Sequence, residues 1–165
     1  MSTPSGRPSG QGLDSPARPN PDQNEDGGLA GRVAAQFREG GSRLMHDMGL
    51  TIIAAEPGRV RFTLPVVEGL THGGGVLSGQ AILACMDTGM VFVMMSLDAT
   101  GDATFTTVQL QTVFERGVPD DIGEVTFEAW ATKTGRTLVF GQIDLLLPDG
   151  RRAASATTTY MWLPS

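Results

Sequence analysis

The sequence predicts an α+β fold in which an antiparallel β-sheet is wrapped around a long central apolar helix. Two observations support this class. Residues 81–95 are apolar on nearly every helical face, and only Asp87 among them carries a charge at neutral pH, as expected of a helix buried on all sides. The second half of the chain holds four strand-like segments with short connections. Parallel strands need crossovers of a dozen residues or more, so these strands must run antiparallel.

The composition predicts one domain preceded by a tail. The chain has 165 residues, enough for a single domain with a proper core. Residues 1–28 contain five of the ten prolines but only three apolar side chains, so they cannot bury enough surface to offset the entropy of ordering. We therefore expect a disordered N-terminal tail over residues 1–28 and a folded domain over residues 29–165.

Charge and composition exclude several classes of partner. The net charge of −6 and the scattered basic residues argue against a nucleic-acid surface, which needs clustered lysine and arginine. The apolar run of residues 81–95 is shorter than the roughly 20 residues that cross a bilayer, so we expect no membrane span. The single cysteine, Cys85, excludes an intramolecular disulfide, which fits a cytoplasmic protein.

The first expected elements are a helix and a strand. Apolar residues recur mostly at every fourth position in residues 29–48, which predicts an amphipathic helix weakened in its middle by Gly40-Gly41. After the turn signal Pro57-Gly58 the period changes to two, because apolar and polar residues alternate up to Leu64, and this predicts a half-buried strand. A glycine-rich stretch, residues 69–79, leads into the apolar helix.

Four strands are expected after the helix, over residues 104–114, 124–133, 137–147 and 151–163. Apolar and polar residues alternate in the first two, as in strands with one buried face. In the first, one face carries Val108, Leu110, Thr112 and Phe114. The segment Pro148-Asp149-Gly150 is a strong hairpin turn between the last two strands.

Asp87 is the first candidate for chemistry. Burying an ionised carboxylate without a partner is costly, so Asp87 must be paired, protonated or reached by a cleft. The alternative is structural: the helix turns Asp87 toward solvent or toward an arginine.

The glycine-rich segment 72–79 ends where the apolar helix begins. Unpaired N–H groups of Gly79 and Gln80 at this helix N-terminus, aided by the helix dipole, would attract a carbonyl oxygen that gains negative charge. The alternative is a flexible turn in which Ser78 caps the helix. A phosphate-binding loop is disfavoured, because that motif needs a lysine and then Ser or Thr after its last glycine.

A strand, a glycine-rich loop, a long apolar helix with an acidic residue in its second or third turn, and further antiparallel strands resemble the hot-dog fold thioesterases. The closest resemblance is to the PaaI-like acyl-CoA thioesterases of phenylacetic acid degradation. The signature of that group is His-Gly-Gly with a catalytic Asp or Glu nine residues after the histidine. Here Ser78-Gly79-Gln80 stands nine residues before Asp87, whereas His72-Gly73-Gly74 would place Ala81 at the acid position. The resemblance covers about residues 29–165.

The resemblance implies roles for individual residues. Gly79 polarises the thioester carbonyl through its backbone, Ser78 and Gln80 bind substrate beside it, and Asp87 acts as general base on water or as nucleophile. His72 matches a position where many members have an asparagine that holds the water or the thioester. Thr107 matches a Ser or Thr that can hydrogen-bond the water.

The resemblance also implies partners. Coenzyme A phosphates need basic residues at the rim of the cleft, and the available ones are Arg116, Lys133, Arg136, Arg151 and Arg152. Members form homodimers, often paired into tetramers, whose sites take residues from both subunits, so we expect a homodimer or a dimer of dimers. We expect no cofactor, and no metal, because neither histidine has a third candidate ligand nearby.

The expected function is hydrolysis of an acyl-CoA thioester to free acid and CoA. Two alternatives stay open. A hot-dog hydratase or dehydratase usually pairs an acid with a histidine on the loop before the helix, and His72 could be that histidine. A non-catalytic acyl-CoA binding module would bind the same ligand without turnover.

Overall fold

The computed structural model describes residues 28–164, so the expected tail lies, except for Gly28, outside the described residues. The helices are α1 (Leu29–Gly40), α2 (Arg43–Asp47) and α3 (Gly79–Leu97), and a short 3-10 turn, η2, spans Glu68–Leu70. The strands are β1 (Thr51–Glu56), β2 (Arg59–Pro65), β3 (Thr71–His72), β4 (Val76–Leu77), β5 (Phe105–Phe114), β6 (Glu124–Thr134), β7 (Leu138–Leu146) and β8 (Arg152–Trp162).

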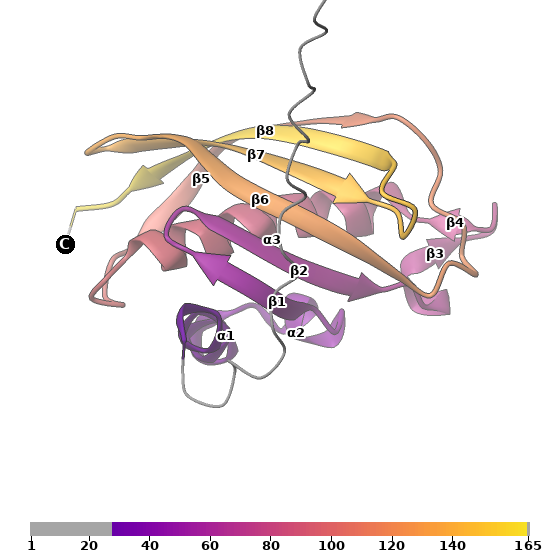
Figure 1. Ribbon diagram of the computed structural model, residues 1–165, viewed down its shortest axis with the longest axis horizontal. Coiled ribbons are helices and arrows are strands. Elements are labelled where there is room, and N and C mark those ends of the chain that lie inside the picture. Colours follow the sequence, from indigo (N-terminus) through magenta and orange to yellow (C-terminus); the bar gives the residue numbers. More distant parts are fainter. Residues whose placement is uncertain (1–27, 165) are drawn as a thin grey trace, which may run out of the picture.

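Six strands form one antiparallel sheet in the order β1-β2-β6-β7-β8-β5, and α3 lies across one face of it (Figure 1). The predicted α+β class, an antiparallel sheet packed against one long apolar helix, is confirmed. The predicted hairpin turn between β7 and β8 is present as well. Gly150 adopts a φ of +83°, and its N–H donates to the Leu147 carbonyl at 2.8 Å.

Helix α3 sits close to the sheet because two glycines leave room for it. A Cβ on Gly89 would lie 3.1 Å from Phe62 and 3.2 Å from Ala129, and a side chain on Gly141 would overlap Met90. By length and composition α3 could cross a membrane, but 67% of its apolar window is buried inside the fold. The helix therefore forms the core of the domain.

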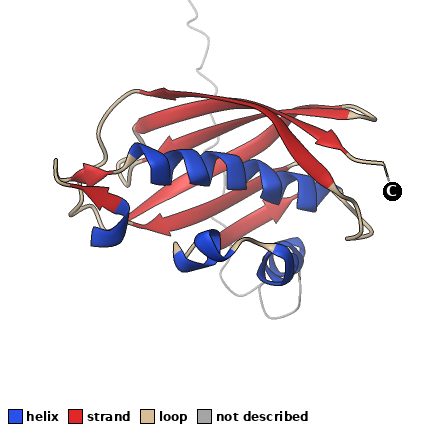
Figure 2. Ribbon diagram, turned by 180° about the vertical axis from the view of Figure 1, so that it is seen from behind, coloured by secondary structure: helices blue, strands red, loops and turns tan. Residues whose placement is uncertain are grey.

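One stripe of α3 is not covered, which corrects the expectation of burial on all sides. Leu83 is 39% exposed, and Ala84, Asp87 and Val91 are partly exposed at helical spacing from it. Figure 2 shows α3 with the sheet behind it and no other described element in front. An apolar stripe with one carboxylate is thus left for another surface to cover.

The single helix predicted over residues 29–48 is wrong: this segment forms two helices. The chain turns at Gly41, whose N–H donates to the Phe37 carbonyl at 2.7 Å in a position where a Cβ would overlap Phe37. Ser42 then caps α2 by accepting a hydrogen bond from the Met45 N–H at 3.4 Å. The Gly40-Gly41 pair therefore ends the first helix and does not merely weaken it.

Three features of the strands are not predicted by the sequence. Strand β1 pairs with β2 across the predicted turn, β3 and β4 form a small hairpin inside the glycine-rich stretch, and β5 has a bulge between Thr107 and Gln109. The bulge breaks the alternation expected in β5 at Val108, which is 55% exposed although it was expected on the face of Leu110. Beyond the bulge the register is regular, so Leu110, Thr112 and Phe114 share one face as predicted.

Candidate active site

Asp87 lies in the third turn of α3, on the uncovered stripe. Its Oδ1 accepts hydrogen bonds from Thr107 Oγ1 at 2.8 Å and from the Tyr160 hydroxyl at 2.6 Å. The same hydroxyl lies 3.0 Å from the backbone oxygen of Asp87. Among the described residues, no ion pair joins Asp87 to a cation. The carboxylate is therefore held by neutral donors and is open to solvent on one side.

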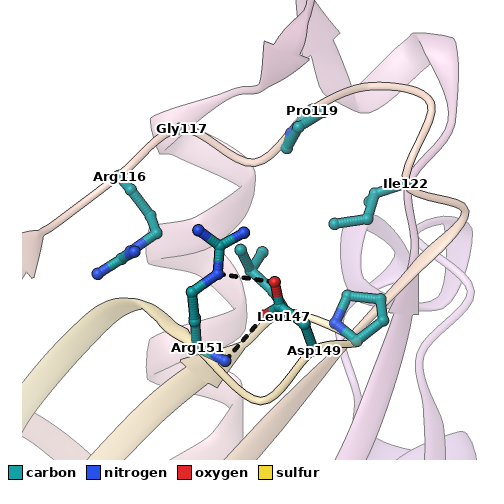
Figure 3. A pocket seen from close by; sticks show the side chains of 8 residues that line it. Arg116, Gly117, Pro119, Ile122, Leu147, Asp149 and Arg151 are labelled. Atoms are coloured by element: carbon teal, nitrogen blue, oxygen red, sulfur yellow. Dashed lines mark hydrogen bonds and ion pairs between the residues drawn. The ribbon is translucent and has the colours of Figure 1, made fainter.

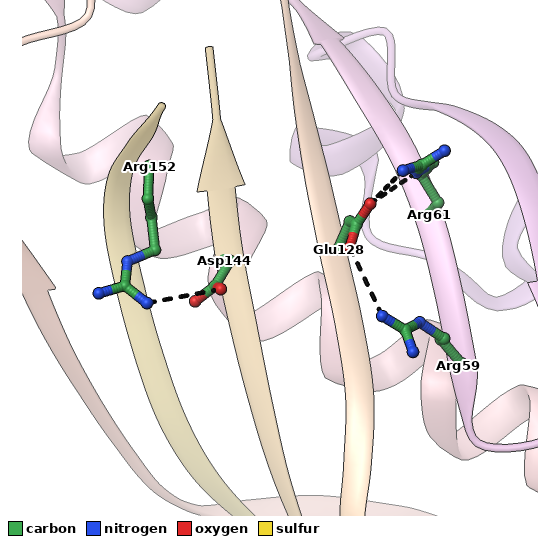
Figure 4. A network of polar contacts seen from close by, with 5 residues as sticks. All are labelled: Arg59, Arg61, Glu128, Asp144 and Arg152. Carbon is green, nitrogen blue, oxygen red and sulfur yellow. Dashed lines mark hydrogen bonds and ion pairs between the residues drawn. The ribbon is translucent and has the colours of Figure 1, made fainter. Parts of the chain in front are cut away.

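Carboxylates on the opposite face of the sheet have different surroundings. Glu128 pairs with Arg61 and with Arg59, the latter at 3.6 Å, and Asp144 pairs with Arg152 at 3.6 Å (Figure 4). The arginines of these pairs are exposed, whereas the Glu128 and Asp144 side chains are half-buried. Unlike Asp87, Glu128 and Asp144 are each paired with a cation.

The N-terminus of α3 leaves backbone donors free. Ser78 is the N-cap, and its Oγ accepts from the Ala81 N–H at 3.2 Å. The N–H groups of Gly79 and Gln80 find no acceptor within residues 28–164. Capping by Ser78 and an anion-attracting helix end are thus compatible, because the cap uses the third N–H and leaves the first two.

His72 lies on β3, in the hairpin beyond the N-terminal end of α3 (Figure 1). It is exposed, and its Nδ1 accepts a hydrogen bond from the Gly74 N–H at 3.0 Å. Asp87 is more than two turns further along α3, so one protomer does not bring the two side chains together. A role for His72 toward substrate stays a prediction.

The predicted basic residues separate into two groups. Arg116 lines a cleft that reaches Gly79 and also a second cleft of about 420 Å³ that contains Arg151 (Figure 3). Lys133 and Arg136 lie at the other end of the sheet, toward the end of α3, where Leu97 and Ala131 flank Gly58. Arg152 belongs to the ion pairs of the outer face. The fold therefore brings Arg116, Arg151 and Arg152 to the end of the molecule where α3 begins, but Arg152 is paired with Glu115 and Asp144.

Tyr160 is the site residue that the sequence does not reveal. It is 1% exposed, and burial raises the pKa of its hydroxyl, as does the hydrogen bond to Asp87, so the phenol stays protonated. A buried tyrosine hydroxyl needs a partner, and this is the signal that could have drawn attention to it. Its partner follows only from the register that sets Tyr160 opposite Thr107.

The other reactive groups near the site are few. Cys85, on the same helix, is fully buried, and burial raises the pKa of its thiol to about 12. Within residues 28–164, no three His, Cys, Asp or Glu side chains form a group that could hold a metal ion. The described site consists of a carboxylate, two hydroxyls and backbone N–H groups.

Comparisons with known proteins relate the chain to thioesterases. The family model of the thioesterase superfamily matches residues 74–154, which include Gly79, Asp87 and Thr107. None of the curated proteins matches the sequence.

Solved structures share most of the chain's fold. A thioesterase family protein from Silicibacter pomeroyi is 28% identical, with a TM-score of 0.73 over 84% of this chain and 100% of its own. The Escherichia coli PaaI protein of the phenylacetic acid degradation operon is 15% identical, with a TM-score of 0.72 over 84% of this chain and 98% of its own. A Streptococcus mutans protein bound to acetyl-CoA is 19% identical, with a TM-score of 0.64 over 71% of this chain and 90% of its own. The last two likenesses show the hot-dog fold alone.

Proposed function

Because the chain belongs to the thioesterase superfamily, we propose that it hydrolyses an acyl-CoA thioester to a free acid and CoA. The acetyl-CoA bound to the Streptococcus mutans neighbour supports a CoA thioester as substrate. The observation that carries the proposal is that α3 presents free N–H groups at Gly79 and Gln80 and an unpaired carboxylate oxygen at Asp87. Thioester hydrolysis needs both: a donor for the carbonyl oxygen, and a group that activates or replaces water.

In the proposed reaction, the Gly79 N–H donates to the carbonyl oxygen, which gains negative charge as the carbonyl carbon is attacked. On one route, Asp87 removes a proton from water while the water oxygen bonds to that carbon. The C–S bond then breaks, its electron pair goes to sulfur, and the thiolate takes up the proton. On the other route, Asp87 attacks the carbon itself, the C–S bond breaks with its electron pair on sulfur, and water then hydrolyses the mixed anhydride to the free acid and the Asp87 carboxylate. Heavy-oxygen label from water in the Asp87 carboxylate would identify the second route.

We also propose that the active form is a homodimer whose sites combine two protomers. Gly79 and Asp87 are eight residues apart on α3, which is about 12 Å along a helix. One thioester group cannot contact both, because reacting atoms must approach to about 3–3.5 Å. A second copy with its α3 antiparallel to the first would bring its own Asp87 toward this Gly79.

The surface for that second copy consists of the uncovered stripe of α3 and the edge strand β5. Strand β5 ends the sheet, so one edge of its backbone is unpaired within the described chain. Val108 and Val113 on it are each 55% exposed. A long edge strand with apolar side chains is a template for pairing with another chain, and a homodimer would cover it together with the stripe.

The two clefts that share Arg116 suggest a path for the CoA arm. The first reaches Gly79 and is walled by Phe114, and the second ends at Arg151 (Figure 3). Arg151 uses its Nε to donate to Asp149 at 2.7 Å, so its terminal nitrogens stay available for a phosphate. We propose that pantetheine follows the first cleft and that Arg116 and Arg151 face the phosphates.

Thiol release tests the proposed function. With aryl and straight-chain acyl-CoAs and a colorimetric thiol reagent, we expect turnover by the wild type and a loss of at least about 100-fold in Asp87→Ala, or nearly 3 kcal/mol. Enoyl absorbance that changes without thiol release would identify a hydratase instead. Ligand binding without either change would identify a binding module. Both outcomes would overturn the thioesterase proposal.

Mixed dimers test the composite site. Asp87→Ala removes the carboxylate and Gly79→Pro removes the N–H, so each homodimer is inactive. A heterodimer of the two has one site with both groups intact. Random assembly makes half of the dimers heterodimers, so co-expression should restore about a quarter of wild-type activity. Activity that stays at the level of the single variants would show that each site lies within one protomer.

A further inference from the structure

The two oxygens of the Asp87 carboxylate have different surroundings. Both hydrogen bonds to the side chain end on Oδ1, from Tyr160 at 2.6 Å and from Thr107 at 2.8 Å. Within residues 28–164 no donor contacts Oδ2. Rotation about the last torsion of an aspartate is broad and exchanges the two oxygens easily, so two donors on one oxygen fix which one faces outward.

Neighbouring strands build this arrangement. Thr107 of β5 and Tyr160 of β8 are direct partners in the sheet, and the β5 bulge begins immediately after Thr107. Bulges often redirect a side chain next to an active site, and here the bulge is adjacent to the hydroxyl that meets Asp87. The Tyr160 ring is buried and packs near Phe105, with ring centroids 6.2 Å apart. The donor atoms thus come from a rigid part of the sheet, not from a loop.

We propose that Tyr160 is a positioning residue which, together with Thr107, holds Oδ1 of Asp87 and so leaves Oδ2 as the oxygen that reacts. This inference rests on the proposed thioesterase function. Tyr160 acts only through Asp87 and needs no contact with substrate. Because burial and the contact with Asp87 raise the pKa of its hydroxyl, Tyr160 can donate to Asp87 near neutral pH.

The electrostatic surroundings make this contact measurable. On α3, β5 and β8, the other ionisable side chains are Cys85, which stays a thiol, and Arg152, which pairs with Glu115 and Asp144 on the outer face. The charged side chains of β2, β6 and β7 nearest the sheet centre, Arg59, Arg61, Glu128 and Asp144, pair on that same outer face. Donors to a carboxylate favour its charged form, so removing one makes protonation easier.

The test is Tyr160→Phe, which removes only the hydroxyl. We expect kcat to fall about 10- to 100-fold, as for loss of a hydrogen bond to a charged group, with KM unchanged. We also expect the acid limb of the kcat profile to move to higher pH. Thr107→Val should change both quantities in the same direction, and Thr106→Val, its neighbour on β5, should change neither.

A double variant separates positioning from a structural role. If Tyr160 acts through Asp87, then Asp87→Asn with Tyr160→Phe is no slower than Asp87→Asn alone. Additive losses, or a Tyr160→Phe enzyme with wild-type kcat and pH profile, would overturn this inference while wild-type thiol release upholds the function. A wild type that releases no thiol would overturn both.

Discussion

The two halves of α3 differ in whether their polar groups are hydrogen-bonded. At the C-terminal end, Asp98 accepts three hydrogen bonds, two from Thr100 at 2.8 and 3.0 Å and one from the Ala103 N–H at 2.9 Å, so both of its oxygens are used. Ser96 donates to the Val93 carbonyl and accepts from the Gly58 N–H. In the N-terminal half, the Gly79 N–H and Oδ2 of Asp87 have no partner within the described chain.

This contrast distinguishes Asp98, which is fully hydrogen-bonded within the fold, from Asp87, for which we propose a function. An unpaired polar group costs about 1–3 kcal/mol where water is excluded, but Asp87 is only partly buried, so its second oxygen can stay free for a ligand without that cost. Asp98 fastens the loop after α3, whereas Asp87 keeps one oxygen for something that is not part of the protomer. Substitutions in one half of α3 at a time test this difference.

The largest expected effect follows from removing the free N–H of Gly79. Proline is well tolerated at the first position of a helix, and Ser78, at φ −69° and ψ 145°, has the extended backbone that a residue before proline prefers. Gly79→Pro should therefore fold normally but lose about 10²–10³-fold in kcat. Circular dichroism and thiol release would measure the two quantities.

Gly79→Ala is the matched control, because it adds a Cβ but keeps the N–H. That Cβ would be 3.7 Å from the Phe114 ring, an ordinary contact, so we expect activity within about threefold of wild type. If alanine and proline impaired kcat equally, the N–H would not be the group that acts on the carbonyl oxygen.

The next effect belongs to the other end of the helix and concerns stability. Asp98 is 7% exposed, and Asp98→Ala would leave the N–H groups of Thr100 and Ala103 without an acceptor. We expect the free energy of unfolding to fall by about 2 kcal/mol, measured with urea, while kcat per folded molecule stays unchanged. Asp102→Ala, at an exposed carboxylate in the same loop, should change stability by less than about 0.5 kcal/mol.

The stabilisation from Asp98 should depend on pH. Burial acts to raise the pKa of Asp98, but the hydrogen bonds from Ala103 and Thr100 outweigh it and lower the pKa below its ordinary value. A lowered folded-state pKa gives stability that is present above the unfolded value of about 3.9 and is lost as the pH falls through the folded value. The stability gap between wild type and Asp98→Ala should thus be constant near neutrality and narrow below about pH 4. A gap that widened on acidification would contradict this assignment.

Local signals were sufficient for the secondary structure that surrounds the site. The apolar run predicts α3, and alternation and tight turns predict β5 to β8. The spacing from Ser78 to Asp87 predicts the acid only through the family resemblance, and its catalytic role stays a prediction. The secondary-structure predictions failed where a single residue can have either of two effects on the backbone. Glycines inside a helical pattern can weaken a helix or end it, and a bulge such as that at Val108 leaves no mark in the hydrophobic pattern.

The remaining site features depend on contacts between distant segments. Tyr160 is 73 residues from Asp87, and its contact requires the register of β8 against β5 as well as the packing of α3 on both. Likewise, composition could not separate Arg116 and Arg151 from Lys133, because the end of the sheet on which each lies is a property of the topology. The residue type determines which interactions a side chain can make, and the topology determines which other groups lie close enough to interact with it.

A smaller effect is expected at the rim of the cleft. Arg116→Ala should raise KM for acyl-CoA about fivefold, or about 1 kcal/mol, because an exposed guanidinium loses a phosphate partner. The KM for the matching acyl-pantetheine, which lacks the nucleotide, should not change. Lys133→Ala, at the far end of the sheet, is the control. Equal KM changes for both substrates would mean that Arg116 does not face the phosphates.

The smallest effect is expected at Cys85, which lies in the same half of α3 as Asp87 but turns into the core. Its pKa of about 12, raised by burial, leaves almost no thiolate at pH 8, and its side chain is 0% exposed. Iodoacetamide should therefore leave the activity of the folded enzyme unchanged and should alkylate Cys85 only in urea, as mass spectrometry would detect. Inactivation of the folded protein, absent in Cys85→Ala, would mean that Cys85 opens to the same surface as Asp87. The boundary between the core face of α3 and its functional face would then have to be drawn elsewhere.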